Sequence, residues 1–176
     1  MAALKQSLRY LHGIIDFGLV FRPSDRLSLV GYADANWRLY FDDRRSMTGY
    51  CVYFGHTPVS WSSKKQQVVS WSTTETEYRS LATATSEVTW LLSLLQELHL
   101  SSTDLPVIWC DNSSAVAVTA NPVLHSKFKH VELDIFFVRE KISQGSLVIG
   151  EVPACDQVAD IFSKPLSISS FVRFQN

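Results

Sequence analysis

The stretch VIWCDNSSAV, residues 107–116, decides the fold because a short apolar strand is followed at once by a carboxylate and by a helix start. Three further stretches, GYADANW (31–37), TTETEYRSLA (73–82) and DQVADIFSKPL (156–166), each place a candidate acid beside an apolar run. The four acids are Asp34, Glu77, Asp111 and Asp160. Hard divalent cations such as Mg²⁺ prefer carboxylate oxygens as ligands. The pattern therefore predicts that these side chains converge on one site for a pair of divalent cations, suited to metal-dependent cleavage of a phosphodiester.

Length and charge predict one domain without an overall basic character. With 176 residues, of which 46% are hydrophobic, the chain is long enough for one unit with a real core and too short for two. A net charge of −1 means that any contact with a polyanion depends on local patches and on bound metal.

Cysteine usage and apolar runs bear on the compartment. Cys51, Cys110 and Cys155 are odd in number and widely spaced, which disfavours a disulfide framework or a zinc knuckle. No apolar stretch approaches the roughly 18 residues that span a bilayer, and no secretory signal core is visible. We therefore expect an intracellular protein, cytoplasmic or nuclear, with no membrane contact.

The order of the expected elements is that of an α/β domain. The chain opens with a helical pattern on Leu4, Leu8 and Leu11, which looks like an appendage. We expect strands at 27–37, 48–54, 58–62, 107–110 and 147–152, and helices at 73–100, 112–120, 131–143 and from 157 onward. The residues after Pro165 look frayed. These boundaries predict a connecting segment at 1–26, one domain at 27–166 and a C-terminal tail at 167–176.

Helical spacing distinguishes Glu77 from the other acids of the long helix. At about 100° per residue, Glu77 lies on the apolar stripe, whereas Glu75 and Glu97 lie on the opposite side. The stripe consists of Leu81, Ala84, Val88, Leu91 and Leu95. A carboxylate on the core face is costly to bury unless a cation compensates it, and a metal is one such cation. A partly exposed first-turn glutamate, favoured by the helix dipole, explains this residue alone equally well.

The three aspartates have structural alternatives as well. Asp34 and Asp111 each follow an apolar strand, near the strand ends where ligands bind in α/β sheets. For either residue alone, ending a strand or capping a helix is the stronger interpretation. Asp160 alone is an ordinary first-turn helix residue. Only the four acids together favour a metal site.

Several motifs occur in the order found in one known family. GYADANW, DDRRSMTGYCVYFG, SKKQQVVSWSTTETEYRSLA, CDNSSAVAV and QVADIFSKPL together resemble the ribonuclease H domain of copia-type retrotransposon Pol polyproteins, over roughly residues 27–166. Residues 1–26 resemble the segment that links this domain to reverse transcriptase. The resemblance implies a ribonuclease H-like fold, with a five-stranded mixed sheet flanked by helices. It also implies cleavage of the RNA strand of an RNA–DNA hybrid, with the reverse transcriptase domain as a partner.

The same resemblance assigns the metal ligands. Carried over residue by residue, the family's metal-binding carboxylates fall on Asp34, Glu77, Asp111 and Asp160. They would hold two Mg²⁺ ions about 4 Å apart, with Mn²⁺ able to substitute. Asp34 is expected to bridge the ions, Glu77 and Asp111 to lie on the leaving-group side, and Asp160 on the water side. Departures from the family pattern leave open a second function, a weak or silent nucleic-acid-binding or interaction module.

Contacts with the hybrid are expected from basic and amide side chains outside the acid quartet. The candidates are Lys64, Lys65, Arg44, Arg45 and Asn112, with Lys64 to Gln67 the clearest cluster for phosphates. A solvated hairpin turn explains the lysines about as well. Asn112 and Glu77 are candidates for reading the 2′-hydroxyl, which distinguishes RNA from DNA. The tryptophans at 61, 71, 90 and 109 are expected in the core.

Overall fold

A mixed five-stranded sheet forms the centre of the computed structural model, which describes residues 2–13, 15, 18–37, 42–100, 102, 104–120 and 129–175. The sheet order is β3-β2-β1-β4-β5. The strands are β1 (Leu29–Asn36), β2 (Met47–Phe54), β3 (Thr57–Lys65), β4 (Val107–Cys110) and β5 (Val148–Glu151). β1 to β3 form an antiparallel meander, whereas β4 and β5 are parallel to β1. The predicted α/β class and five-stranded mixed sheet are confirmed.

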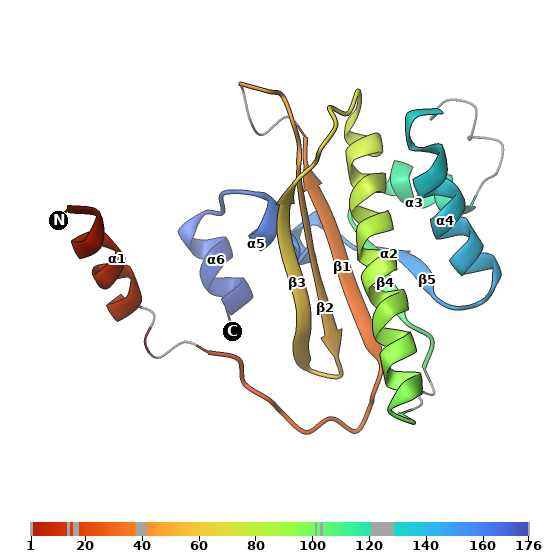
Figure 1. Cartoon of the computed structure of the whole chain (residues 1–176), viewed down its shortest axis with the longest axis horizontal. Coiled ribbons are helices and arrows are strands. Elements are labelled where there is room, and N and C mark those ends of the chain that lie inside the picture. The colour runs from red at the N-terminus through yellow and green to blue at the C-terminus, as the bar shows by residue number, and fades with distance from the viewer. Residues whose placement is uncertain are drawn as a thin grey trace.

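Helices cover both faces of this sheet. They are α1 (Ala2–Gly13), α2 (Thr73–Glu97), α3 (Ser113–Ala120), α4 (Glu132–Ser143), α5 (Asp160–Ser163) and α6 (Ile168–Gln175), with short 3-10 turns η2 (Lys129–Val131) and η3 (Ala154–Asp156). Figure 1 shows α2, α3 and α4 on one side of the sheet and α5 and α6 on the other. Helix α1 stands apart from the sheet, as an appendage would (Figure 1).

The C-terminal tail differs from the expectation. Residues 168–175, predicted to be frayed, form α6, and Arg173 pairs with Asp156 just before α5. The sequence signal was the spacing of Ile168, Phe171 and Val172, which puts apolar residues on one face of a short helix. In the part of the chain that the structure describes, no helix is long and apolar enough to cross a membrane.

The core lies between α2 and the sheet. Ser72 caps α2 by accepting the Glu75 backbone N–H at 3.2 Å, so the helix begins close to its predicted start. Leu81 and Val88 of the predicted apolar stripe are fully buried, together with Ile108 of β4. Burying one such side chain stabilises the fold by roughly 1.5–3 kcal/mol. This packing fixes the rotation of α2 and so decides which of its acids faces the sheet.

The prediction that the tryptophans lie in the core is wrong for three of them. Trp61, Trp71 and Trp90 are 48%, 75% and 58% exposed, whereas Trp109 is half-buried. Trp61 lies on the edge strand β3 and Trp90 on the outer stripe of α2, so neither has a second layer to cover it. Trp71 precedes α2 and stacks on His130, with ring centroids 6.5 Å apart. Aromatic character alone did not tell a buried ring from one stacked at the surface.

Candidate metal centre

Two of the four acids are brought together by the parallel pairing of β1 with β4. Tyr32 pairs with Trp109, so Asp34 and Asp111, each two residues further along, lie at the same carboxyl-end edge of the sheet. Asp34 is fully buried, and Asp111 is half-buried. This edge is where α/β sheets bind ligands.

Helix α2 supplies the third acid. Glu77 lies in its second turn and is only 7% exposed, on the face turned to the sheet. The neighbouring Ser80 hydroxyl donates to the backbone oxygens of Asp34 (2.7 Å) and Gly49 (3.2 Å). These two bonds tie α2 to β1 and β2 beside the acids.

The fourth acid, Asp160, opens helix α5, which packs on the opposite face of the sheet. Gly49 lies opposite Asp34 in the antiparallel register, and a Cβ there would come within 2.9 Å of the Ala159 backbone oxygen. A residue without a side chain is therefore needed at position 49 for α5 to approach this closely. Gln157 adds a bond across the interface, because its amide donates to the Ala33 oxygen at 3.0 Å.

All four predicted acids meet in one cluster. Carboxylate oxygens of Asp34, Asp111 and Asp160 lie within 4.8 Å of one another. A second group with the same spacing joins Glu77, Asp111 and the Cys110 sulfur. Asp111 belongs to both groups. The four acids thus converge as the sequence pattern predicts, while their role as metal ligands stays a prediction.

Lys164 is a member of this cluster that the sequence reasoning missed. Its Nζ lies 3.0 Å from Asp34 Oδ1 and 2.7 Å from Asp160 Oδ1. Burial lowers the pKa of Lys164, but the charges of Asp34 and Asp160 outweigh it, and the net pKa is raised. The Ser163 hydroxyl also donates to the Asp34 carboxylate. The available signal was the (i, i+4) spacing of Asp160 and Lys164, at which a helix pairs opposite charges.

Glu77 and Asp111 form no ion pair of this kind among the described residues, although the charge of Lys164 lowers the pKa of each. Burial, and then the charges of Asp34 and Asp111, raise the pKa of Glu77 from 4.5 to about 9. Burial is also the main cause of the raised pKa values of Asp111 and Asp160. Within the described residues, Glu77 Oε2 is buried and has no hydrogen-bond partner. A buried orphan oxygen among mutually repelling carboxylates fits a site that divalent cations complete, because the cations would supply the missing charge.

The predicted lysine cluster borders a hollow on the surface. Lys64 and Lys65 line a cavity of about 320 Å³ together with Arg79 of α2. Lys65 is already paired with Asp43, at 2.8 Å, whereas Lys64 is exposed. Gln66 lines this cavity too, although it is largely buried and its amide donates to Thr48 and to the Thr76 backbone. Contact of this lysine and amide cluster with phosphates stays a prediction.

The other predicted substrate contacts lie in turns. Arg44 is exposed and takes a left-handed backbone conformation with φ of 55°, and Arg45 lies 3.6 Å from Asp43. Asn112 caps α3, since its side-chain oxygen accepts the Ala115 backbone N–H at 2.9 Å. Its amide nitrogen is not used by this cap. Contact of these residues with a nucleic acid stays a prediction.

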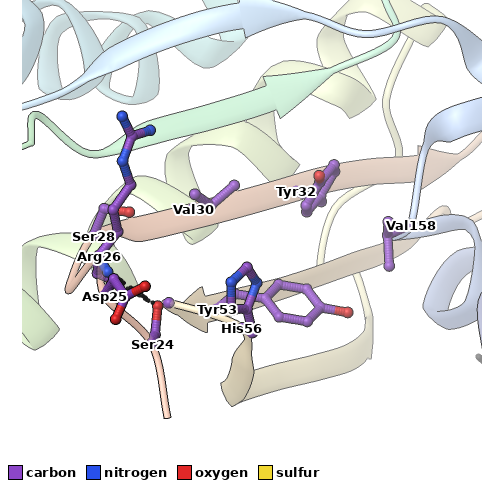
Figure 2. Close-up of a pocket in the computed structure, with 10 residues that line it drawn as sticks. Ser24, Asp25, Arg26, Ser28, Val30, Tyr32, Tyr53, His56 and Val158 are labelled. Atoms are coloured by element: carbon purple, nitrogen blue, oxygen red, sulfur yellow. Dashed lines mark hydrogen bonds between the residues drawn. The ribbon is translucent and has the colours of Figure 1, made fainter. Parts of the chain in front are cut away.

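A larger hollow lies away from the acids. Figure 2 shows Tyr32 and Tyr53 projecting from neighbouring strands, with His56 and Val158 at its margin. The two tyrosine rings meet edge to face, with centroids 6.2 Å apart, and the cavity measures about 620 Å³. None of the four acids lines it. The acid cluster and this aromatic hollow are thus separate features of the molecule.

The sheet order, with acids from β1, α2, the end of β4 and α5 at one edge, defines a ribonuclease H-like domain. Solved structures agree. LC11-RNase H1, isolated from compost by a metagenomic approach, superposes with a TM-score of 0.59 at 16% identity, over 78% of this chain and 93% of that one. The foamy viral protease-reverse transcriptase in complex with RNA/DNA hybrid gives 0.57 at 12% identity, over 89% of this chain and 22% of that one.

Sequence relatives identify the family. The chain is 48% identical over 172 residues to the retrovirus-related Pol polyprotein from transposon RE2 of Arabidopsis thaliana, covering 98% of this chain and 12% of the polyprotein. The polyprotein from transposon RE1 of the same plant is 47% identical, covering 99% and 12%. No family model matches. The chain is a ribonuclease H-like domain related to the Pol polyproteins of copia-like retrotransposons, and it spans about an eighth of their length.

Proposed function

We propose that this chain is a metal-dependent endonuclease that hydrolyses the RNA strand of RNA–DNA hybrids. The observation that carries the proposal is the convergence of four acids with an orphaned, buried Glu77 oxygen among them. Fold neighbours solved with RNA/DNA hybrid and the relationship to Pol polyproteins support the choice of substrate. In such a polyprotein, residues 1–26 would join the domain to the reverse transcriptase.

The four acids would hold two Mg²⁺ ions, for which Mn²⁺ can substitute. When bound, such a pair supplies Lewis-acid charge at the scissile phosphate. Asp34 would bridge the ions, Glu77 and Asp111 would face the leaving 3′-oxygen, and Asp160 would orient the attacking water. Gly49 and Gln157 fix the position of α5 and hence of Asp160. The expected products carry 5′-phosphate and 3′-hydroxyl ends.

Lys164 supplies positive charge to Asp34 and Asp160 from within the chain. Its ammonium lies between the two carboxylates and reduces their mutual repulsion. Cations of higher charge would displace this contact, and the Lys164 side chain is one-third exposed, so it has a path to solvent. Lys164 would then remain close enough to approach a phosphate oxygen of the substrate.

Substrate binding would use the surface beside β3. Lys64, Lys65 and Arg79 around their shared hollow can contact phosphates of the duplex. The amide nitrogen of Asn112, which the cap of α3 does not use, would donate to a 2′-hydroxyl in the minor groove. Phosphate contacts would position the hybrid, and the 2′-hydroxyl contact would select the RNA strand.

Cleavage of a labelled RNA–DNA hybrid tests the proposal directly. With Mg²⁺ or Mn²⁺ the chain should cut the hybrid's RNA strand and leave RNA-only and DNA-only duplexes intact. Asp34→Asn should lower the rate at least about 100-fold, because the loss of a metal ligand removes several kcal/mol of transition-state stabilisation. Asp104→Asn changes an exposed aspartate outside the cluster and should keep the full rate. Absence of hybrid cleavage by the folded protein in either metal contradicts the proposal.

A silent binding or interaction module is the second candidate. The ion pairs of Lys164 with Asp34 and Asp160 favour this second candidate, because they compensate two of the acids without metal. Thermal unfolding with and without Mg²⁺ separates the two functions. A cation that binds only the folded state raises the unfolding temperature, and Asp34→Asn should abolish that rise. An unfolding temperature that neither Mg²⁺ nor Mn²⁺ changes would favour the silent module.

A further inference from the structure

Cys110 brings a sulfur atom into a cluster that otherwise consists of oxygen ligands. It is the last residue of β4, is fully buried, and faces α2. Its Sγ lies within 4.8 Å of a carboxylate oxygen of Glu77 and of one of Asp111. Burial and the charge of Glu77 raise the pKa of the Cys110 thiol and outweigh the backbone N–H of Asn112, which donates to the same sulfur at 3.5 Å, so the sulfur carries a proton until an ion replaces it.

A second observation shows that this group lacks a ligand. Glu77 is more than nine-tenths buried, and its Oε2 has no hydrogen-bond partner among the described residues. A buried oxygen without a partner costs free energy that a bound cation removes. No salt bridge to Glu77 or Asp111 is found in the described part of the chain, whereas Lys164 compensates the neighbouring pair of acids. The part of the acid cluster without an ion pair is therefore the part beside the Cys110 sulfur.

We infer that Glu77, Cys110 and Asp111 form a site for thiophilic divalent cations, Zn²⁺ or Cd²⁺, and that such an ion blocks the Mg²⁺ site. Two carboxylates and one thiolate suit a four-coordinate ion with one open position. Soft thiolate selects Zn²⁺ and Cd²⁺ over Mg²⁺, whereas the carboxylates serve both classes of ion. Coordination forms a metal–sulfur bond and releases the thiol proton to solvent. The bound ion occupies Glu77 and Asp111 and thereby excludes Mg²⁺ from them.

The blocking of Mg²⁺ rests on the proposed function, but the binding of the soft ion does not. The chain offers matched controls, because it has two other cysteines outside the cluster. Cys51 is buried on β2, where it pairs with Tyr32, and Cys155 is exposed in η3. Replacing both by serine leaves Cys110 as the sole thiol of the protein.

Cadmium titration of this sole-thiol protein without Mg²⁺ tests the site. An ultraviolet thiolate-to-cadmium charge-transfer band should appear and saturate at one ion per chain. Adding Cys110→Ser should abolish the band. Glu77→Gln, which keeps the thiol, should raise the cadmium concentration for half-saturation by about tenfold, because one of three ligands is lost. Excess Mg²⁺ should weaken the band by competing for the shared carboxylates. A sole-thiol protein that is folded by circular dichroism and gives no band overturns the inference.

Hybrid cleavage then tests the blocking, with each protein compared with its own rate in Mg²⁺ alone. Cadmium should inhibit the sole-thiol protein, and Cys110→Ser should need about tenfold more cadmium for the same fractional inhibition. Equal cadmium sensitivity of the two proteins overturns the blocking. A charge-transfer band without cleavage by any variant would defeat the proposed function and leave the site standing. Mg²⁺-dependent cleavage without a charge-transfer band would defeat the thiophilic site and leave the proposed function standing.

Discussion

The two halves of the acid cluster carry similar charge but are compensated in different ways. Asp34 and Asp160 share the ammonium of Lys164, at 3.0 and 2.7 Å, and Asp34 also accepts a hydrogen bond from Ser163. On the other side, Glu77 keeps an orphaned buried oxygen, and burial raises its pKa to about 9. The chain itself therefore supplies a positive charge to one half, whereas Glu77 in the other half requires either a proton or a cation.

This difference separates two tasks of the site. The lysine-bound half can be assembled as soon as α5 packs on the sheet, because the chain itself supplies the positive charge. Glu77, whose pKa is raised to about 9, keeps its proton at neutral pH until a divalent ion displaces it. Cation binding should thus be coupled to proton release mainly at Glu77. Changes on each side should have distinguishable effects on stability and on metal response.

The largest expected effect is the pH dependence of stability without metal. Folding keeps the proton of Glu77 up to about pH 9, whereas the unfolded chain loses it near 4.5. The folded state therefore binds more protons between these values, and its free energy of unfolding should fall as pH rises. The fall should reach up to about 4 kcal/mol between pH 5 and 8, at about 1.36 kcal/mol per unit. Denaturant unfolding at several pH values measures it.

Glu77→Gln should remove most of this slope, because a neutral amide no longer titrates. Glu97→Gln, on the exposed end of the same helix, should leave the slope unchanged. Saturating Mg²⁺ should also flatten it by favouring the ionised carboxylate. A slope that survives Glu77→Gln would show that the two halves of the cluster do not differ as described.

Removal of Lys164 should have the next largest effect, on the opposite half. Lys164→Met leaves Asp34, which is fully buried, without its cation. We expect a loss of about 3 kcal/mol, at the lower end for a broken buried pair, because Lys164 is one-third exposed. Mg²⁺ should restore more stability to this variant than to the unchanged protein. Lys5→Met on the exposed helix α1 is the control, and equal stability of the two variants would contradict the role of Lys164.

Gly49→Ala should act more weakly and through geometry. The added methyl would meet the Ala159 backbone oxygen at 2.9 Å, so α5 must shift away from the sheet. Overpacking of this kind costs about 1–3 kcal/mol. Because Asp160 moves with α5, Mg²⁺ affinity measured by calorimetry should fall as well. Gly13→Ala meets nothing within 4 Å and should change neither quantity; unchanged Mg²⁺ affinity in Gly49→Ala would show that α5 does not set the site.

Much of the fold could be predicted from local patterns. The apolar run 107–110 predicted β4 with its observed bounds, and the stripe through Leu81 and Val88 predicted the buried face of α2. The same stripe selected Glu77 as an acid facing the sheet, but it did not predict that Glu75 is buried as well, where it accepts the Trp71 backbone N–H and pairs with Arg79. These predictions succeed because side-chain period and secondary structure are linked along one element. Family resemblance added the ribonuclease H-like fold and the assignment of the four acids as metal ligands, which stays a prediction.

Features that depend on contacts between distant segments could not be predicted in this way. Lys164 reaches Asp34 only because α5 packs against β1, 130 residues away in the chain. Cys110 becomes part of the cluster only through the rotation of α2 beside β4. The exposure of Trp61 follows from the edge position of β3, which the residues of that strand do not encode locally. The missed features are thus tertiary, and the compensation of each half of the site is one of them.

The smallest expected effect lies outside both halves and tests whether they are independent of substrate contacts. Lys64→Ala removes an exposed charge, whereas Lys65→Ala removes one already paired with Asp43. Lys64→Ala should weaken hybrid binding a few-fold and lower the slope of log affinity against log salt by about one, as expected for one lost phosphate contact. Lys65→Ala should lower the slope less, because Asp43 already neutralises its charge. Both variants should bind Mg²⁺ as the unchanged protein does, and a loss of Mg²⁺ affinity in either would mean that the basic surface helps to compensate the acids.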